Sequence, residues 1–338
     1  MVEVLVTGGA GFIGSNFVRY ALARHPDWRV TTLDKLTYAG RRENLHDVMA
    51  DARHEFVHGD IGDAAISGPL VERSAIVVHF AAETHVDRSI MAAGDFIRTD
   101  VEGTFVLLEA ARRASGLRRF VQISTDEVYG SVPTGASRES DELKPRNPYA
   151  ASKAGADRLA YSYWATYELP IVITRASNNY GPYQFPEKVI PLFVTNAIDD
   201  LPLPLYGDGR NVRDWLHVDD HCAAIDLLID QGTDGEVYNI GGSNDITNVE
   251  LTHRILALAG KPTSLIQPVA DRKGHDRRYS LDTTKLRARG WAPRVPFEEG
   301  LVQTVAWYRR NEWWWRPIKE NDPAFREYYA KQYEHRTT

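Results

Sequence analysis

The sequence predicts an α/β protein with a doubly wound parallel sheet and a smaller C-terminal lobe. Short apolar runs alternate with helical segments through the first half of the chain, as in a parallel sheet covered by helices. A glycine-rich turn directly follows the first apolar run. The rhythm changes after about residue 178, where prolines cluster and we expect loops around a pocket. These prolines are Pro182, Pro186, Pro191, Pro202 and Pro204.

The expected elements follow one another in a regular order along the chain. The expected strands cover residues 2–6, 29–33, 55–58, 76–80, 120–123, 171–174 and 237–240. The expected helices cover residues 12–24, 100–114, 149–167, 218–229, 248–259 and 297–310. The segment 76–80 is strongly apolar, which is typical of a strand buried on both faces of a parallel sheet.

Composition excludes several classes of protein. The net charge is -6 and the 40 basic residues are scattered, so we expect no nucleic-acid partner. No apolar run approaches the length of a membrane span and no leader pattern is visible, so we expect no membrane partner and a cytoplasmic location. Cys222 is the only cysteine, which excludes a disulfide and a cysteine-based zinc site. We expect a buried structural thiol there and no metal in the protein.

The glycine-rich turn predicts a dinucleotide site. Residues 7–14 read TGGAGFIG between the first expected strand and helix, with glycines at 8, 11 and 14. Glycines let the backbone approach a pyrophosphate, and the helix N-terminus offers free N–H groups and a positive dipole end. Asp34 ends the second strand, where a carboxylate can bind the adenosine ribose and repel a 2′-phosphate. The pattern therefore favours NAD, and we expect a Rossmann-type, NAD-binding domain over residues 1–178.

A second group of residues predicts redox chemistry joined to proton transfer. Thr125, Asp126 and Glu127 follow the strand 120–123, and Tyr149 and Lys153 are one helical turn apart on the next helix. Adjacent residues of a strand point to opposite faces. The two acids can therefore act together only from a turn just past the strand end. Because these residues come from the same part of the chain as the glycine turn, we expect the domain 1–178 to carry the catalytic residues.

Longer motifs resemble those of a known family. The glycine pattern, Asp34 and the Tyr-x-x-x-Lys pair are similar to those of the extended short-chain dehydrogenase/reductases. Within that group, four runs resemble the dTDP-glucose 4,6-dehydratases over nearly the whole chain: residues 81–89 (AAETHVDRS), 124–130 (STDEVYG), 177–184 (SNNYGPYQ) and 213–220 (RDWLHVDD). The acid pair Asp126-Glu127 is the most specific element, because related epimerases and decarboxylases usually lack an acid at the position of Asp126.

The resemblance implies a reaction of three steps. Dehydration of dTDP-glucose to dTDP-4-keto-6-deoxyglucose, in deoxysugar biosynthesis, would proceed by oxidation at carbon 4, elimination of water across carbons 5 and 6, and re-reduction at carbon 6. Tyr149 would act as a phenolate favoured by the cation of Lys153 and by the positive nicotinamide, with Thr125 hydrogen-bonded to the same oxygen. Glu127 would be the general base and Asp126 the general acid, its pKa raised by burial or by Glu127.

The resemblance also assigns binding residues. The residues expected to bind NAD are Gly8, Gly11, Phe12, Ile13, Gly14, Asp34, Lys35, Thr37, Asp60, Ile61, Ala81, Ala82, Thr99, Ser124, Tyr149, Lys153 and Asn179. Residues 179–338 would form mainly a nucleotide-sugar-binding lobe, with some segments returning to the first domain. Tyr206 would stack on the base, and Arg213 would hold the diphosphate. The residues expected to bind substrate are Thr84, Thr125, Asn178, Glu187, Lys188, Pro204, Tyr206, Arg213, Asn248, Arg272 and His275.

Several alternatives stay open at this point. A UDP-sugar dehydratase or a 4-epimerase would share most of these residues, and a non-catalytic NAD-binding regulator is a third interpretation. The residues do not decide between a thymidine and a uridine nucleotide. The family is usually dimeric through a helical bundle, which here implies the segments 100–114 and 149–167. We expect His79, His85 and His217 to be structural, and the tryptophans at 313–315 to pack on the body or form an oligomer contact.

Overall fold

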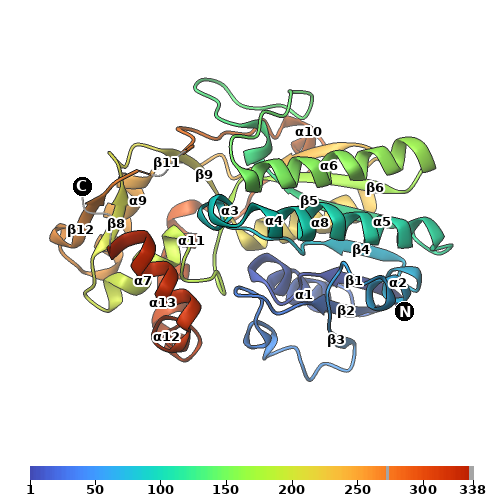
Figure 1. Cartoon of the computed structure of the whole chain (residues 1–338), viewed down its shortest axis with the longest axis horizontal. Coiled ribbons are helices and arrows are strands. Elements are labelled where there is room, and N and C mark those ends of the chain that lie inside the picture. The colour runs from blue at the N-terminus through green and yellow to red at the C-terminus, as the bar shows by residue number, and fades with distance from the viewer. Residues whose placement is uncertain (272–273, 335–338) are drawn as a thin grey trace.

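The computed structural model describes residues 1–271 and 274–334. Its centre is a seven-stranded, all-parallel sheet in the order β10-β6-β5-β4-β1-β2-β3 (Figure 1). The strand order reverses between β1 and β4, which is where α/β sheets of this type bind ligands. The strands are β1 (Val2–Thr7), β2 (Trp28–Asp34), β3 (His54–His58), β4 (Ile76–His79), β5 (Arg119–Thr125), β6 (Ile171–Ala176) and β10 (Val237–Ile240).

Helices cover both faces of this sheet, as Figure 1 shows. Alternate residues of β1 point to opposite faces. Val4 and Val6 pack with helices α1 (Phe12–Arg24) and α8 (Val218–Gln231). Leu5 belongs to the core on the other face. That face carries α2 (Ala64–Glu72), α5 (Thr104–Arg113) and α6 (Pro148–Tyr167).

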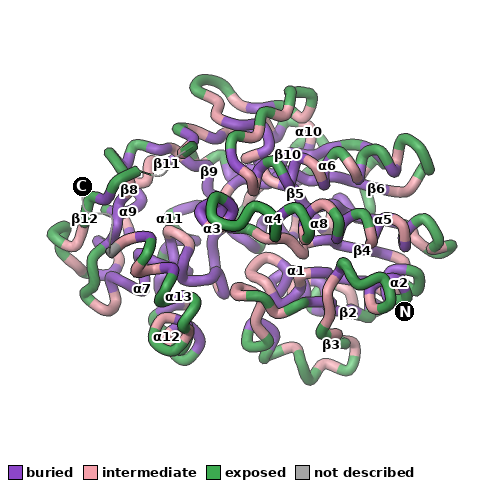
Figure 2. The backbone as a smooth tube through the Cα atoms, viewed as in Figure 1, coloured by how far each residue is buried: buried purple, intermediate pink, exposed green. Residues whose placement is uncertain are grey.

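The second half of the chain forms a smaller lobe with its own apolar core. Figure 2 shows buried backbone in the lobe as well as along the strands of the large sheet. Two small sheets lie here, with strand orders β11-β9-β7 and β12-β8. Their strands are β7 (Asn178–Tyr180), β8 (Leu203–Tyr206), β9 (Val212–His217), β11 (Asp245–Thr247) and β12 (Ile266–Val269). The helices of the lobe are α7 (Val189–Ile198), α9 (Asn248–Ala259), α11 (Phe297–Arg310), α12 (Glu312–Asn321) and α13 (Pro323–Tyr329). Helix α10 (Thr284–Arg287) packs instead beside β10 of the large sheet, where Leu286 joins a core with Tyr238 and Ile240.

The strands and helices expected from periodicity are all present, most with bounds within a residue or two. The segment expected to be helical from residue 100 begins earlier. Short helices α3 (Val86–Met91) and α4 (Ala93–Phe96) lead into a wider turn, Ile97–Gly103, which continues as α5. Short 3-10 or wide helical turns complete the described chain at Arg42–Leu45, Asp126–Tyr129, Thr263–Leu265 and Ala330–Glu334.

The expectation of loops throughout the proline-rich segment is wrong for α7 and β8. Pro191 lies in the first turn of α7, where a backbone N–H has no intrahelical acceptor to lose. Pro204 lies in β8, which among the described strands pairs with β12 alone and therefore has one free edge. Proline is tolerated at both places, so the cluster of prolines does not prevent a helix and a strand from forming there.

Candidate active site

The carboxyl ends of the central strands surround a cavity. The structure brings all of the residues predicted to bind NAD to its wall, together with the predicted catalytic residues. Thr7, the last residue of β1, pairs with Leu33 of β2 and His79 of β4, so the loops after these strands start at one edge. The sequence could predict this assembly because parallel strands present their carboxyl ends together.

The glycine-rich turn fits close against backbone. A Cβ on Gly8, whose φ is +69°, would meet the backbone nitrogen of Ala81 at 2.5 Å. A Cβ on Gly14 would lie 2.3 Å from the carbonyl oxygen of Gly8. Gly11 differs, because its Cβ would meet only that same oxygen, at 3.2 Å, and would otherwise extend into open space beside the cavity. Gly8 and Gly14 thus shape the turn, and Gly11 leaves room at the start of α1 for a pyrophosphate.

The acidic residues after β2 and β3 lie at the same cavity. Asp34 is 8% exposed, and its carboxylate accepts hydrogen bonds from the backbone N–H of Ala10 at 2.9 Å and of Leu36 at 2.8 Å. Burial raises the pKa of Asp34 despite these two donors. Lys35 pairs with Asp60 at 2.7 Å, so each neutralises the other beside the cavity. The carboxylate of Asp34, placed to bind a ribose, and the glycine-rich turn together fit a dinucleotide.

The predicted catalytic residues converge from β5 and α6. Strand β5 ends at Thr125, and Asp126 and Glu127 follow in the 3-10 turn Asp126–Tyr129, as the strand geometry predicted. The hydroxyl of Thr125 donates to Oδ1 of Asp126 at 3.2 Å and is hydrogen-bonded to Tyr149. Tyr149 and Lys153 lie one turn apart on α6 and both line the cavity.

The environment of Asp126 suits a proton donor. Its side chain is 3% exposed, and burial, followed by the charge of Glu127, raises its pKa well above the usual range. Its Oδ2 has no hydrogen-bond partner in the described part of the chain. Burial of this kind favours the protonated, neutral form of the carboxyl. The prediction of a raised pKa at Asp126 is therefore confirmed.

The surroundings of Tyr149 and Lys153 shift both of their pKa values. Burial, followed by the carboxylates of Glu127 and Asp100, raises the pKa of Tyr149 well above its usual value. The ammonium of Lys153 instead donates to the carbonyl of Ile123 at 2.7 Å, and burial lowers its own pKa. Desolvation and nearby carboxylates thus disfavour the phenolate of Tyr149, and the assistance expected from Lys153 and a bound nicotinamide stays a prediction.

A second cavity adjoins the first on the side of the smaller lobe. Thr84, Glu127, Asn178 and Lys188 line both cavities and so mark where they meet. The predicted substrate residues at the wall of the second cavity are Thr84, Asn178, Glu187, Lys188, Pro204, Tyr206, Arg213, Asn248 and His275. Thr125 lies in the first cavity. Arg272, the remaining predicted residue, lies outside the described residues.

The far end of this second cavity combines aromatic rings and cations. The ring of Tyr206 lies 6.0 Å from that of His275 and 5.9 Å from that of Tyr333. Arg213 is 6% exposed, and its Nη2 donates to the carbonyl of Asp276 at 3.0 Å. Glu187 is almost fully buried and accepts from Nη2 of Arg88 at 2.9 Å, so one of its oxygens is already engaged within the protein.

Comparisons with known proteins agree with this geometry. A family model described as GDP-mannose 4,6 dehydratase matches residues 5–304. The dTDP-glucose 4,6-dehydratase of an Actinoplanes strain is 53% identical over 320 residues, which cover 93% of this chain and 100% of the relative. The chain belongs to the NAD-dependent epimerase/dehydratase family of extended short-chain dehydrogenase/reductases.

Solved structures of this epimerase/dehydratase family have the same fold. The crystal structure of DesIV, a dTDP-glucose 4,6-dehydratase from Streptomyces venezuelae with NAD and TYD bound, has a TM-score of 0.92 and 55% identity, covering 94% of this chain and 100% of DesIV. The UDP-glucose 4-epimerase of Thermus thermophilus, in complex with NAD, has a TM-score of 0.84 and 35% identity, covering 91% and 99%. The α/β fold expected from the sequence is confirmed.

Several residues at or beside the two cavities were not predicted from the sequence. Tyr279 contacts Glu127 from a distant part of the chain, with 3.3 Å between its hydroxyl and Oε2. His221 lines the first cavity, and its Nδ1 lies 2.9 Å from Oδ1 of Asn179. Arg88 lies 4.0 Å above the ring of Tyr38, beside Glu187. Arg88 stands within a motif that carried the resemblance and His221 directly follows another, so both could have been named, whereas Tyr279 had no local signal.

The remaining expectations for single residues concern structural roles. His79 is buried between the hydroxyls of Thr7 and Thr104, and burial lowers its pKa to about 3, which keeps it neutral. Cys222 is buried in α8, and burial raises the pKa of its thiol. Among the described residues, no three His, Cys, Asp or Glu side chains gather as metal ligands. None of the described helices has the length and apolarity that crossing a membrane requires.

Proposed function

We propose that this protein is an NAD-dependent dTDP-glucose 4,6-dehydratase that converts dTDP-glucose to dTDP-4-keto-6-deoxyglucose for deoxysugar biosynthesis. The observation that carries the proposal is the acid pair at the junction of the two cavities. Asp126 is buried with a raised pKa, and Glu127 lines both cavities. A 4-epimerase has no need of an acid and a base together at this point. The relatives named dTDP-glucose 4,6-dehydratase support the same choice.

The first cavity is proposed to hold NAD. The glycine turn would receive the pyrophosphate, Asp34 the adenosine ribose, and Asp60 with Ile61 the adenine. Tyr149 lines the same cavity and is hydrogen-bonded to Thr125, directly before the acid pair. Bound NAD would supply the hydride acceptor for oxidation at carbon 4 and, once reduced, the hydride donor for reduction at carbon 6, a step in which carbon 5 regains a proton.

The protein's own groups are proposed to move three protons. Tyr149, assisted by Thr125, takes the proton of the carbon-4 hydroxyl. The raised pKa of Tyr149 means that the phenolate must form within the loaded complex, where a positive nicotinamide adds to the charge of Lys153. Glu127 removes the proton on carbon 5, which the neighbouring ketone has made acidic. Asp126 gives its proton to the carbon-6 oxygen, so that water leaves.

The second cavity is proposed to hold the nucleotide. Arg213 would bind the diphosphate bidentately, and Tyr206 with Pro204 would face the base. Thr84, Asn178, Glu187 and Lys188 would surround the hexose, and Asn248 and His275 would complete the nucleotide end. In this proposal residues 1–178 bind NAD and carry the catalytic groups, and residues 179–338 mainly bind the nucleotide sugar.

A substrate panel tests the reaction. The purified protein is incubated with dTDP-glucose and with UDP-glucose, and products are read by the alkali-induced ketone chromophore and by nuclear magnetic resonance. We expect the 4-keto-6-deoxy product from dTDP-glucose and a kcat/KM at least about fivefold lower for UDP-glucose, since a lost methyl contact costs roughly 1 kcal/mol or more. A 4-epimer as the main product would replace this proposal by an epimerase, and preference for UDP-glucose would make the protein a UDP-sugar dehydratase.

Two variants separate catalysis from binding. Tyr149→Phe removes the phenol and should abolish even the first reduction of bound NAD when substrate is added. Glu127→Gln should still reduce bound NAD but stall before water is lost. If the wild-type protein binds NAD and shows no turnover with any sugar nucleotide, the non-catalytic regulator is the correct interpretation.

We also propose a homodimer formed through α5 and α6. Phe105 is 48% exposed and Tyr167 44% exposed on these two helices, with Ile97 and Tyr161 also exposed nearby. Exposed apolar side chains gathered on neighbouring helices are typical of a protein interface. Sedimentation equilibrium should give twice the chain mass, and Phe105→Glu should shift the protein to monomer. A wild-type monomer would contradict this part of the proposal.

A further inference from the structure

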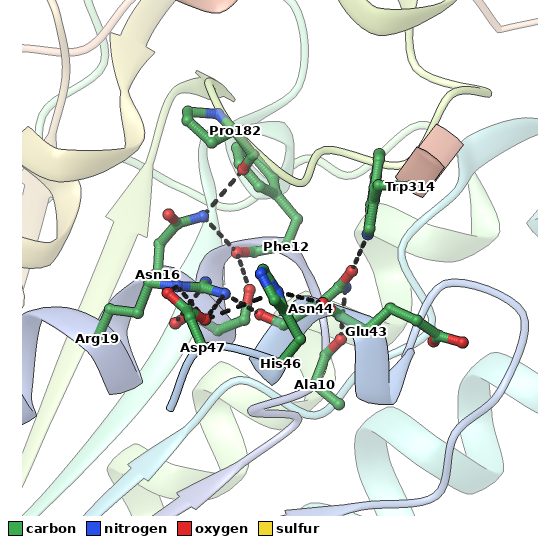
Figure 3. Close-up of polar contacts among 11 residues, drawn as sticks. Ala10, Phe12, Asn16, Arg19, Glu43, Asn44, His46, Asp47, Pro182 and Trp314 are labelled. Atoms are coloured by element: carbon green, nitrogen blue, oxygen red, sulfur yellow. Dashed lines mark hydrogen bonds and ion pairs between the residues drawn. The ribbon is translucent and has the colours of Figure 1, made fainter. Parts of the chain in front are cut away.

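A chain of buried hydrogen bonds connects helix α12 of the smaller lobe to the glycine-rich turn, and Figure 3 shows it. Nε1 of Trp314 donates to Oδ1 of Asn44 at 2.7 Å. Nδ2 of Asn44 donates to the carbonyl of Ala10, also at 2.7 Å. The backbone N–H of Ala10 then donates to Oδ2 of Asp34 at 2.9 Å. The chain therefore ends on the carboxylate that is proposed to bind the ribose.

Each hydrogen bond in this chain is buried and has a fixed donor and acceptor. Trp314 and Asn44 are each 1% exposed, so water does not compete for their polar atoms. An indole N–H can only donate, whereas an amide has an acceptor at one end and donors at the other. Trp314 therefore fixes the orientation of the Asn44 amide, with Oδ1 toward the indole and Nδ2 toward Ala10. Loss of the indole N–H would leave Oδ1 of Asn44 buried without this hydrogen bond, which costs free energy and removes the constraint on the amide.

The Ala10 peptide is the point where this chain meets the cofactor cavity. Ala10 lies between Gly9 and Gly11, and its carbonyl also accepts from the backbone N–H of Arg41 at 3.0 Å. The Ala10 carbonyl belongs to the peptide group shared with Gly11, which lines the cavity, and the Ala10 N–H belongs to the preceding peptide group, which bonds Asp34. The two peptide groups meet at the Cα of Ala10, so a displacement of the Ala10 backbone would move both features that a dinucleotide would contact.

A second contact holds the same region from the other side. Nδ2 of Asn16, on α1, donates to the carbonyls of Phe12 and Pro182, at 2.9 and 3.0 Å (Figure 3). The next residue, Tyr183, packs edge-on against Trp314 with 5.7 Å between ring centroids. Helix α12 thus reaches both the turn before α1 and the first turn of α1. Neither Trp314 nor Asn44 lines the cavity, and Trp314 lies beyond the residues matched by the family model.

We propose that Trp314 and Asn44 are positioning residues of the dinucleotide site, which hold the backbone of Ala10 and, through it, Asp34. Helix α12 then determines how tightly the protein retains NAD. This inference rests on the proposed function only in that the first cavity binds NAD.

The test compares two tryptophans of one helix. Trp314→Phe keeps an aromatic ring in the core and removes the N–H that reaches Asn44. Trp315→Phe is the matched control, because Trp315 is 0% exposed and its Nε1 donates to the carbonyl of Tyr308 at 2.8 Å, within the C-terminal lobe. Both changes remove one buried indole N–H, but only the first belongs to the chain that ends at Asp34.

The measurements are the dissociation constant for NAD by equilibrium dialysis and the rate at which bound NAD exchanges with labelled NAD. Trp314→Phe should weaken NAD binding roughly five- to twentyfold, the size of one lost buried hydrogen bond that supports the site. Trp315→Phe should weaken it no more than about twofold, because the bond that it loses lies within the C-terminal lobe. At saturating NAD the kcat of Trp314→Phe should equal that of the wild type. Hydrogen exchange in the peptide that spans residues 7–17 should become faster in Trp314→Phe and not in Trp315→Phe.

Asn44→Ala tests the chain by a second route if Trp314→Phe folds poorly. The double variant should bind NAD no more weakly than Asn44→Ala alone, because both changes break the same chain. Equal NAD affinity in Trp314→Phe and Trp315→Phe, or additive effects in the double variant, would overturn the inference while NAD binding by the wild type stands. If the wild-type protein binds no NAD, the proposed function fails first and this inference fails with it.

Discussion

The hydroxyl of Tyr279 lies 3.3 Å from Oε2 of Glu127, although 152 positions separate the two residues in the chain. The same hydroxyl lies 2.6 Å from Oδ2 of Asp276, and the guanidinium of Arg213 lies 4.4 Å above the tyrosine ring. Tyr279 therefore connects the proposed general base to the proposed diphosphate ligand. Oε2 of Glu127 also accepts a hydrogen bond from Nδ2 of Asn147, at 3.3 Å.

Tyr279→Phe should slow the loss of water more than the first oxidation. The change keeps the ring under Arg213 and removes the hydroxyl that helps to orient Glu127. We expect the elimination rate to fall on the order of tenfold, a fraction of the total effect of a positioned base. Rapid mixing with dTDP-glucose, followed by the absorbance of reduced cofactor, measures both steps. Tyr163→Phe is the control, since its hydroxyl pairs with Glu109 at 2.6 Å, and an equal loss there would contradict the prediction.

Asp126→Asn should remove the alkaline limb of the elimination rate. Burial and the charge of Glu127 raise the pKa of Asp126, so the acid keeps its proton to a higher pH than an exposed aspartate and loses it as pH rises through that pKa. The wild-type elimination rate should therefore fall with rising pH. In the asparagine variant the rate should be lower by roughly a hundredfold and flat over the same range. A variant that keeps the wild-type pH profile would assign the acid to another group.

Gly11→Ala should weaken NAD binding without unfolding the protein. A Cβ at Gly11 meets only one backbone oxygen at 3.2 Å but stands at the cavity wall. We expect NAD affinity to fall by at least about tenfold, as for one misplaced group in a tight site, with a melting temperature close to that of the wild type. Gly116→Ala, where a Cβ would meet no atom within 4 Å, is the control. Gly14→Ala should instead destabilise the fold, because its Cβ would lie 2.3 Å from a backbone oxygen.

Asp100→Asn should flatten the dependence of stability on acid pH. Burial raises the pKa of Asp100 from 3.8 to about 6, against the attraction of Lys153 and the hydrogen bond from Ser152. Between these two values the folded protein holds a proton that the unfolded chain has lost, so the free energy of unfolding falls as pH rises. The loss is at most about 3 kcal/mol, and the asparagine variant should not show it.

Melting temperatures of wild type and Asp100→Asn, measured at intervals from pH 4 to pH 7, check this directly. The amide retains an oxygen for the backbone N–H of Glu83, which donates to Asp100 at 2.8 Å. The variant should gain stability relative to the wild type as pH rises. A difference that stays constant with pH would show that Asp100 does not titrate in this range.

Periodicity in the sequence was sufficient for the large sheet and for helices α1, α5, α6, α8, α9 and α11. The bounds of α1, α9, α11 and β10 match the predicted ranges, because each has a continuous local pattern. Helix α7 escaped prediction, since Pro191 reads as a breaker until its place in the first helical turn is known. Strand β8 was missed for a similar reason, because only its pairing with β12 shows that Pro204 lies in an edge strand, where proline is tolerated.

The sequence by itself determined which residues meet at the cavity, because the glycine turn, Asp34, the acid pair and the Tyr-x-x-x-Lys helix all follow strands of one parallel sheet. Strand order carries such residues to a shared edge whatever lies between them. The tertiary structure alone decided the protonation and support of those groups. The raised pKa of Tyr149, the contact of Tyr279 with Glu127 and the link from Trp314 to Ala10 depend on burial and on contacts between distant segments, which no local pattern encodes.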